Sequence, residues 1–400
     1  MSKTSRFGTA LCLSAIGWTG VAHAAPCASL PSPLVVSGST AVQTLIAKVA
    51  PPLGAATGAD QMTVVYKGSG SCSGVTQLGL DTTPTGACVA GGCITGTATY
   101  WDAAGAAQMC DLDPAGTHVD LILSDVYKES CEGVTNTKLR GEPLLVIPFA
   151  FIVPKASTQE AIDAREAYYV YGKGMSAAVT PWINEASLFR RNNGSGTQVT
   201  IYKNIRIPVG SPIGIEATGT GDMITKVASA ANAEQALGFA GLDAVDTKRA
   251  MVDILAYRHY GQTKFYWPDS SVTAFDKKNV RDGHFPLWGY EHAITLVDDA
   301  GQPLKANAKK FADILAGKVS VPGFNAIVEE SKAGVVPLCA MDVTRTADGG
   351  DFSVATGESC ACFFEKNAGP AGGATSCTAC TADTMCTTGQ HCRNGYCEAR

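Results

Sequence analysis

The sequence predicts an α/β protein in which strands end in glycine- and hydroxyl-rich turns that open helices. Three such junctions carry the prediction, and they follow apolar runs at residues 34–36, 62–66 and 186–189. Because strands alternate with helices along the chain, we expect a mainly parallel sheet. In such sheets ligands collect beyond the carboxyl ends of the strands, where all these turns lie.

The three turns share a composition that suits an anion. They read Ser-Gly-Ser-Thr at 37–40, Lys-Gly-Ser-Gly-Ser-Cys-Ser-Gly at 67–74 and Arg-Arg-Asn-Asn-Gly-Ser-Gly-Thr at 190–197. Glycines let the backbone approach a ligand, while hydroxyls and the first amides of a helix donate hydrogen bonds. An arginine adds charge in a planar fork that matches a tetrahedral oxyanion. One such turn is typical of an ordinary loop, but three together indicate an anion site.

Further elements follow from periodicity and composition. Apolar residues at 42, 45, 46 and 49 predict a helix that Pro51-Pro52 ends. We expect a buried strand at 119–123 that ends at Ser124-Asp125, a glycine-rich strand at 237–241 and a return strand at 292–297. Helices are expected at 160–171, from 217–222 onward, and as an amphipathic pair within 307–332.

The N-terminus predicts export. Residues 1–24 combine basic Lys3 and Arg6, an apolar run and a final Ala-His-Ala, which is typical of a cleavable signal peptide. No other stretch reaches eighteen apolar residues, so we expect no membrane insertion. Without the signal the chain has 29 basic and 36 acidic residues, a net charge of −7. This balance argues against nucleic acid or an anionic membrane as partner.

The cysteines are interpreted in an oxidising compartment. Fourteen of the fifteen remain after cleavage, and this even number indicates disulfides of undetermined pairing. Residues 79–117 hold Cys88, Cys93 and Cys110 and predict a stapled insertion with an exposed Tyr100-Trp101 pair. Eight cysteines fall in residues 339–400, where a disulfide knot is favoured over zinc. Adhesion, partner docking and protease resistance are open roles for this tail.

With these motifs in place, residues 33–335 resemble the periplasmic phosphate-binding proteins of ABC uptake systems, within the type II periplasmic-binding-protein family. Residues 66–75 are similar to the family's Tyr-Gln-Gly-x-Gly-Ser-x-Gly-Gly-Val turn, and 190–197 to its Arg-Arg-x-Asp-Gly-Ser-Gly-Thr turn. Ser124-Asp125 falls where the family has Ser-Asp. The resemblance implies a two-lobed periplasmic-binding-protein fold with hinged lobes and a central cleft, and a small disulfide-rich C-terminal segment is added to it.

The resemblance also implies a division of the chain. Lobe 1 would hold residues 25–146, with the insertion at 79–117, and its return at 285–338; lobe 2 would hold 147–284, and the tail 339–400. The apolar run 144–153, interrupted by Pro148, is of the kind that crosses between lobes. We expect a periplasmic or extracellular monomer without cofactor or metal, with an ABC permease as partner.

Carried over by position, the resemblance names the residues of a phosphate site. Asp125 would accept a hydrogen bond from the protonated phosphate oxygen, and Arg191 would pair with the anion's charge. Phosphate carries a proton at neutral pH and sulfate does not, so a buried carboxylate selects between them. The expected donors are hydroxyls and backbone amides of Ser39, Thr40, Ser71, Ser195, Gly196 and Thr197.

Departures from the family pattern leave alternatives open. Ala41 replaces an aromatic residue, Asn193 replaces an aspartate that orients the arginine, and Arg190 competes with Arg191 as ligand. The ligand could be another oxyanion or a small carboxylate. Alternative functions are a structural or adhesive surface protein with a diverged site and, less favoured, a secreted phosphatase. No metal-ligand spacing or base for Ser195 is evident, so we expect no enzyme.

Overall fold

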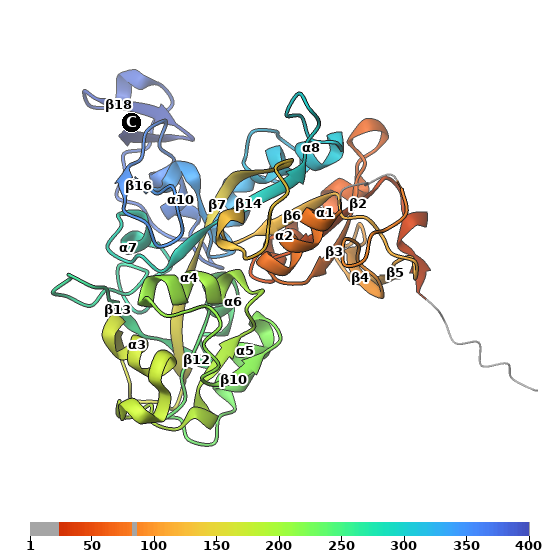
Figure 1. Ribbon diagram of the computed structural model, residues 1–400. Coiled ribbons are helices and arrows are strands. Elements are labelled where there is room, and N and C mark those ends of the chain that lie inside the picture. Colours follow the sequence, from red (N-terminus) through yellow and green to blue (C-terminus); the bar gives the residue numbers. More distant parts are fainter. Residues whose placement is uncertain (1–23, 82–85, 400) are drawn as a thin grey trace, which may run out of the picture.

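The computed structural model describes residues 24–81 and 86–399. It divides into two lobes and a tail (Figure 1). Lobe 1, at the upper right of the figure, holds α1, α2 and α8, and lobe 2, below it, holds α3 and α5. The predicted signal peptide, apart from Ala24, lies outside the described residues. No helix among the described residues is long and apolar enough to cross a membrane.

Parallel strands form the centre of lobe 1. Strand β2 (Pro33–Gly38) lies between β3 (Thr63–Gly68) and β6 (Leu121–Ser124) and pairs with both in parallel. Helix α1 (Gln43–Ala55) follows β2, and α2 (Ser71–Leu80) follows β3. The strands predicted at 34–36, 62–66 and 119–123 are thus confirmed as β2, β3 and β6. Their carboxyl ends meet at one edge of the sheet.

The sheet continues into the cysteine-containing insertion. Strand β4 (Thr97–Trp101) pairs antiparallel with β3 and with β5 (Ala107–Asp111), which in turn pairs with β1 (Ala25–Pro26). Trp101 is buried, with its ring 6.5 Å from that of Tyr66. The prediction that the pair at 100–101 is exposed is therefore wrong for Trp101. This residue lies on the face of the sheet that α1 covers.

One long strand connects the two lobes. Strand β7 (Leu139–Pro154) pairs with β14 (Trp288–Leu296) as far as Pro148 and with β11 (Gly238–Gly241) from Phe149 onward. Strands β12 (Val252–Ile254) and β15 (Val336–Pro337) also pair with it. All these pairs are antiparallel, so the expectation of a mainly parallel sheet is wrong for the strands that pair with β7. Parallel pairing is found for β2 with β3 and β6, for β1 with β5, and in the small sheets of lobe 2.

Lobe 2 presents the third turn. Strand β9 (Phe189–Arg191) pairs in parallel with β10 (Ile215–Ala217) and leads into α4 (Gly196–Ile205), while α5 (Thr220–Ala228) follows β10. Helix α3 (Ala164–Lys173) begins with a capping box in which Asp163 and Glu166 bond each other's backbone amides. The remaining elements are β8 (Ala161–Asp163), α6 (Leu242–Val245), β13 (Ala256–Arg258) and α7 (Lys278–Arg281).

Two predicted boundaries differ from the structure. Pro51 and Pro52 lie inside α1 and do not end it. The amide of Ala56 still bonds the Pro52 carbonyl, and Leu53 is buried in the core, so packing carries the last turn. The strand expected at 186–189 begins only at Phe189, because Glu185–Ser187 form a 3₁₀ turn that the Asn184 side chain caps.

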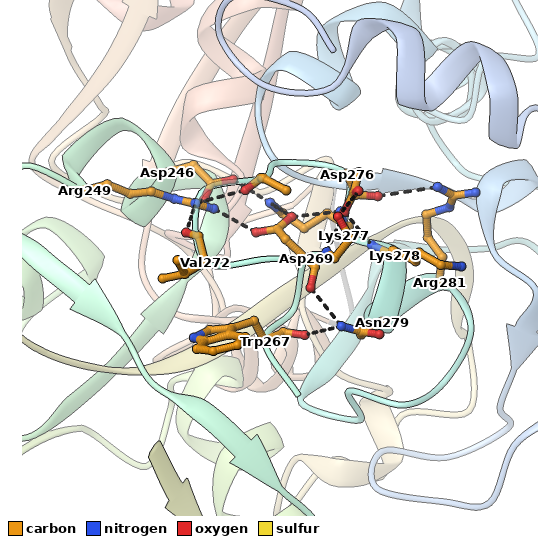
Figure 2. Close-up of polar contacts among 12 residues, drawn as sticks. Asp246, Arg249, Trp267, Asp269, Val272, Asp276, Lys277, Lys278, Asn279 and Arg281 are labelled. Atoms are coloured by element: carbon orange, nitrogen blue, oxygen red, sulfur yellow. Dashed lines mark hydrogen bonds and ion pairs between the residues drawn. The ribbon is translucent and has the colours of Figure 1, made fainter. Parts of the chain in front are cut away.

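A buried ion-pair network anchors the segment that returns to lobe 1 (Figure 2). The Lys277 Nζ atom is 2.7 Å from Asp246 Oδ2 and 2.9 Å from Asp269 Oδ1. Arg249 Nη2 reaches both carboxylates as well, at 2.7 and 2.8 Å. Because both carboxylates have two cationic partners, residues 246–249 and 269–277 are held together.

The tail is a disulfide-bonded unit at the upper left of Figure 1, and it packs on α7 as well as on lobe 1. Arg281 of α7 donates to the Ala340 carbonyl and pairs with Glu365 at 2.9 Å. The guanidinium of Arg345 lies 3.7 Å from the centre of the Trp288 ring.

The last elements of lobe 1 before the tail are α8 (Ala306–Leu315) and α9 (Ala326–Lys332). The tail itself contains β16 (Val343–Thr344), β17 (Ser353–Val354), α10 (Ala361–Asn367), β18 (Gln390–Arg393) and β19 (Tyr396–Ala399).

All fourteen cysteines of the described chain form disulfides. In lobe 1, Cys72 of the second turn pairs with Cys131. The insertion is closed by Cys88–Cys93 and joined to Cys27 through Cys110. The eight tail cysteines pair among themselves, as the knot prediction requires: Cys339–Cys360, Cys362–Cys377, Cys380–Cys392 and Cys386–Cys397.

The ion-pair network predicts that two adjacent lysines, Lys277 and Lys278, contribute very differently to the free energy of unfolding. Lys277→Met should lower the free energy of unfolding by about 3–5 kcal/mol, because it leaves Asp246 and Asp269 buried with a single cation. Lys278, which is 61% exposed, is the matched control, and Lys278→Met should change stability by less than about 0.5 kcal/mol. Denaturant unfolding measures both, and equal effects would show that the network contributes no stability.

Candidate functional site

The carboxyl ends of the lobe 1 strands meet the start of α4 in a buried polar centre. Ser39 follows β2, Ser71 begins the helix after β3, and Asp125 follows β6. Arg191 and the turn to α4 come from lobe 2. The side chains at 39, 71, 125, 191, 195 and 197 are each 2% exposed or less. These predicted site residues are therefore brought together in one place that solvent does not reach, and Thr40, which is partly buried, lies at its edge.

Asp125 is the centre of the hydrogen bonds. Its Oδ1 accepts from the Ser39 hydroxyl and its Oδ2 from the Thr197 hydroxyl at 3.5 Å. The backbone amide of Asp125 donates to Ser71 Oγ at 3.1 Å. Burial raises the pKa of Asp125, while its hydrogen bonds and the charge of Arg191 act to lower it. A carboxylate held in this way is available to accept a further proton donor.

Arg191 faces the first turn, and Arg190 faces away from it. The Arg191 Nε atom donates to the Ala217 carbonyl at 3.2 Å, and Nη2 lies 3.4 Å from Thr40 Oγ1. Arg190 pairs with Glu216 at 3.0 Å near the surface. The alternation of side chains along β9 accounts for this opposite placement.

The departure at Asn193 does not leave Arg191 without support. Asn193 Oδ1 accepts a hydrogen bond from Gln198 Nε2 at 3.3 Å, within the turn itself. Arg191 is oriented instead by the carbonyl of Ala217 at the end of β10. A backbone acceptor from the neighbouring strand thus holds the guanidinium where an aspartate was expected. Ala41, the other departure, is fully buried.

The start of α4 presents donors to the centre. Ser195 caps the helix, and its Oγ accepts from the Gln198 amide at 3.5 Å. Among the described residues, no acceptor is bonded to the amides of Gly196 and Thr197. These amides carry the positive end of the helix dipole. The start of α2 differs, because the amides of Cys72 and Ser73 donate to the Gly194 carbonyl at 2.9 and 3.4 Å.

Glycines make this close contact between the turns possible. A Cβ atom on Gly196 would lie 2.4 Å from Ser71 Oγ and 2.9 Å from Asp125 Cβ. Gly70 has a positive φ of 96°, and a Cβ there would lie 2.8 Å from the Gly194 carbonyl oxygen. The two turns pack against each other directly, and the lobes are closed at this point.

Four residues of the centre were not predicted from the sequence. Thr220, at the start of α5, lies 3.3 Å from Thr40 through their hydroxyls, and the Tyr66 hydroxyl donates to the Ser39 carbonyl. Glu291 of β14 and Asp243 of α6 are buried acids whose charges act on Asp125 or on each other. The available signal was Glu291, the one acid in β14.

The chain belongs to the PBP superfamily: residues 20–318 match its domain. A search of the curated proteins gave no match. Among solved structures, it is similar to a protein from Clostridium perfringens described as a phosphate ABC transporter substrate-binding protein with bound phosphate. That comparison has 14% identity and a TM-score of 0.51, and covers 76% of this chain and 99% of the other. An ABC-type phosphate transport receptor from Vibrio cholerae gives 16% identity, a TM-score of 0.46 and coverages of 76% and 99%. The fold is thus the mixed α/β fold of periplasmic binding proteins, with a disulfide-rich tail added.

The contact between the two turns predicts that residue 196 must be glycine, because there is no space for a side chain. Gly196→Ala should lower the free energy of unfolding by about 1–3 kcal/mol and increase the radius of gyration, because the new methyl group separates the two turns. Gly221→Ala is the matched control, since a Cβ on Gly221 meets no atom within 4 Å. Denaturant unfolding and small-angle X-ray scattering compare the two proteins. Identical behaviour would show that the turns do not pack as described.

Proposed function

We propose that the chain is an exported solute-binding protein that captures inorganic phosphate between its lobes for an ABC-type permease. One observation carries the proposal: a guanidinium, Arg191, and a carboxyl group, Asp125, are buried together among hydroxyl groups and free helix amides. An anion that also carries a proton is complementary to this pair, because it accepts from the cation and donates to the carboxylate.

The Asp125 carboxylate, as a buried hydrogen-bond acceptor, favours phosphate over sulfate in this proposal. Phosphate retains a proton at neutral pH, which it can donate to Asp125. Sulfate has no such proton and would place bare negative charge against a buried carboxylate, with a penalty that water does not screen. The same argument disfavours carboxylate ligands that are fully ionised.

Donors for the remaining oxygens come from both lobes. Thr40 and Ser71 belong to lobe 1. The Ser71 oxygen accepts from the Asp125 amide and its side chain also bonds the Asp125 carboxyl group, so its hydroxyl hydrogen would turn from that carboxyl to the ligand. Ser195 accepts from the Gln198 amide and keeps its own hydrogen to donate. The amides of Gly196 and Thr197 and the dipole of α4 add to the attraction for an anion.

Capture would proceed by closure of the lobes. Each lobe alone supplies part of the donor set, so the ligand binds the closed form more tightly than the open form and shifts the population toward it. The buried centre can exchange its ligand only when the lobes separate. The hinge we propose is β7, together with β14, since β7 changes its pairing partners between Pro148 and Phe149.

Binding without chemistry is the activity that we propose. The Ser195 hydroxyl bonds the start of its own helix, and among the described residues no histidine bonds it. His292 lies near the centre, but its Nδ1 atom faces the Ser124 carbonyl at 3.4 Å. Support for the ligand comes from the Clostridium perfringens protein, whose structure holds phosphate. Periplasmic or extracellular residence agrees with seven disulfides.

Calorimetric titration of the oxidised, ligand-stripped protein tests the proposal. We expect phosphate to bind with a dissociation constant below about 1 μM. Sulfate should bind at least about 10³-fold more weakly. Asp125→Ala and Arg191→Ala should each weaken phosphate binding by about 100-fold or more, because each leaves a buried charge without its partner.

Arg190→Ala is the matched control for Arg191→Ala. Its exposed pair with Glu216 contributes little, so phosphate affinity should change by less than about fivefold. Absence of phosphate binding by the unmodified protein would refute the proposal. Tight sulfate binding would refute only the role of Asp125 and would leave an anion site of different selectivity.

A further inference from the structure

Glu291 is a buried carboxyl group that points at the same centre. It lies in β14, all of whose residues are buried. Gly289, two residues earlier and on the same face, approaches so closely that a Cβ would lie 2.1 Å from the Asp125 carbonyl oxygen. The side chain of Glu291 lies within hydrogen-bonding reach of the Asp125 carboxyl group. The β14 strand therefore places a second carboxyl against the first.

No other group satisfies Glu291. Within residues 24–81 and 86–399, neither of its carboxyl oxygens has a hydrogen-bond donor. Buried polar groups are almost always bonded, and an isolated buried carboxylate is strongly unfavourable. A proton on Glu291 resolves this, because a carboxylic acid can donate to the Asp125 carboxylate that lies beside it.

The charges around Glu291 also favour its protonated form. Asp125 faces it from the end of β6, Asp243 from α6 and the Tyr66 hydroxyl from β3. Arg191 of β9 is a cation that acts on the neighbouring Asp125. Burial and then the charge of Asp125 raise the pKa of Glu291 well above its ordinary value.

We propose that Glu291 is a further specificity-determining residue of the anion site, which holds a proton against Asp125 and makes anion binding depend on that proton. The proposal rests on the proposed function. An ionised Glu291 would add a negative charge beside the entering anion, in a medium that does not screen it. A neutral Glu291 keeps Asp125 as the charged acceptor and adds no repulsion.

The sign of the pH dependence follows by linkage. A bound anion raises the pKa of Glu291 further, so affinity is greatest below the pKa of the free protein and falls as the pH rises through it. Loss of one proton lowers the affinity by up to about tenfold for each pH unit above that pKa. The ligand's own titration is common to all variants and cancels when they are compared.

Phosphate titrations of three proteins from about pH 6 to about pH 10 test this inference. Glu291→Gln imitates the protonated acid, and Glu330→Gln is the matched control. Glu330 is also a fully buried glutamate with a pKa raised by burial, but no charge of the site acts on it. At the acid end all three should bind within about threefold of one another. As the pH rises, the unmodified protein and Glu330→Gln should weaken relative to Glu291→Gln, by up to about tenfold per unit.

Two results of these titrations would overturn the inference. One is a single pH profile for all three proteins, and the other is tighter binding by Glu291→Gln at every pH, as expected for a permanently ionised glutamate. Infrared absorption distinguishes failure of the inference about Glu291 from failure of the proposed phosphate binding. A protonated carboxyl C=O band at neutral pH that disappears in Glu291→Gln would establish the protonated acid even in a protein that does not bind phosphate, and its absence would refute it.

Discussion

The burial of Asp125 opposite Arg191 is the constraint around which the two lobes are arranged. Two charges from different lobes are removed from water, and each would be costly without compensation. Asp125 is compensated by the Ser39 and Thr197 hydroxyls, and Arg191 by the Ala217 carbonyl. The polar composition of the turns is therefore required by the contact between the lobes itself.

Close contact between the lobes sets a second requirement, which is met by small residues. The Gly194 carbonyl accepts from the first amides of α2, so it occupies a helix start that could otherwise receive an anion. At the start of α4, the amides of Gly196 and Thr197 have no acceptor among the described residues. The two helix starts consequently differ in role: α2 receives the opposite lobe, and α4 supplies donors. This asymmetry could not be inferred from the similar sequences of the two turns.

Local patterns predicted the turns, the strands before them and the helices after them, because glycine and hydroxyl residues between apolar runs have a strong local preference. The placement of Arg191 in place of Arg190 depended on pairing with β10, which is a contact distant in sequence. Glu291 and Asp243 were missed because their position beside Asp125 arises from contacts distant in sequence: Glu291 lies in β14, which pairs with β6, and Asp243 lies in α6 after β11. Trp101 was misjudged for the same reason, since β4 joins a sheet that composition did not reveal.

The disulfides are confined to particular parts of the molecule. Residues 147–284 contain no cysteine, and the seven bonds lie within lobe 1 or within the tail. Oxidation therefore stiffens lobe 1, where Cys72–Cys131 joins the start of α2 to the chain just after Asp125. It adds no covalent link across β7. An oxidising environment can thus stabilise the molecule against unfolding without placing a disulfide across the hinge that we propose.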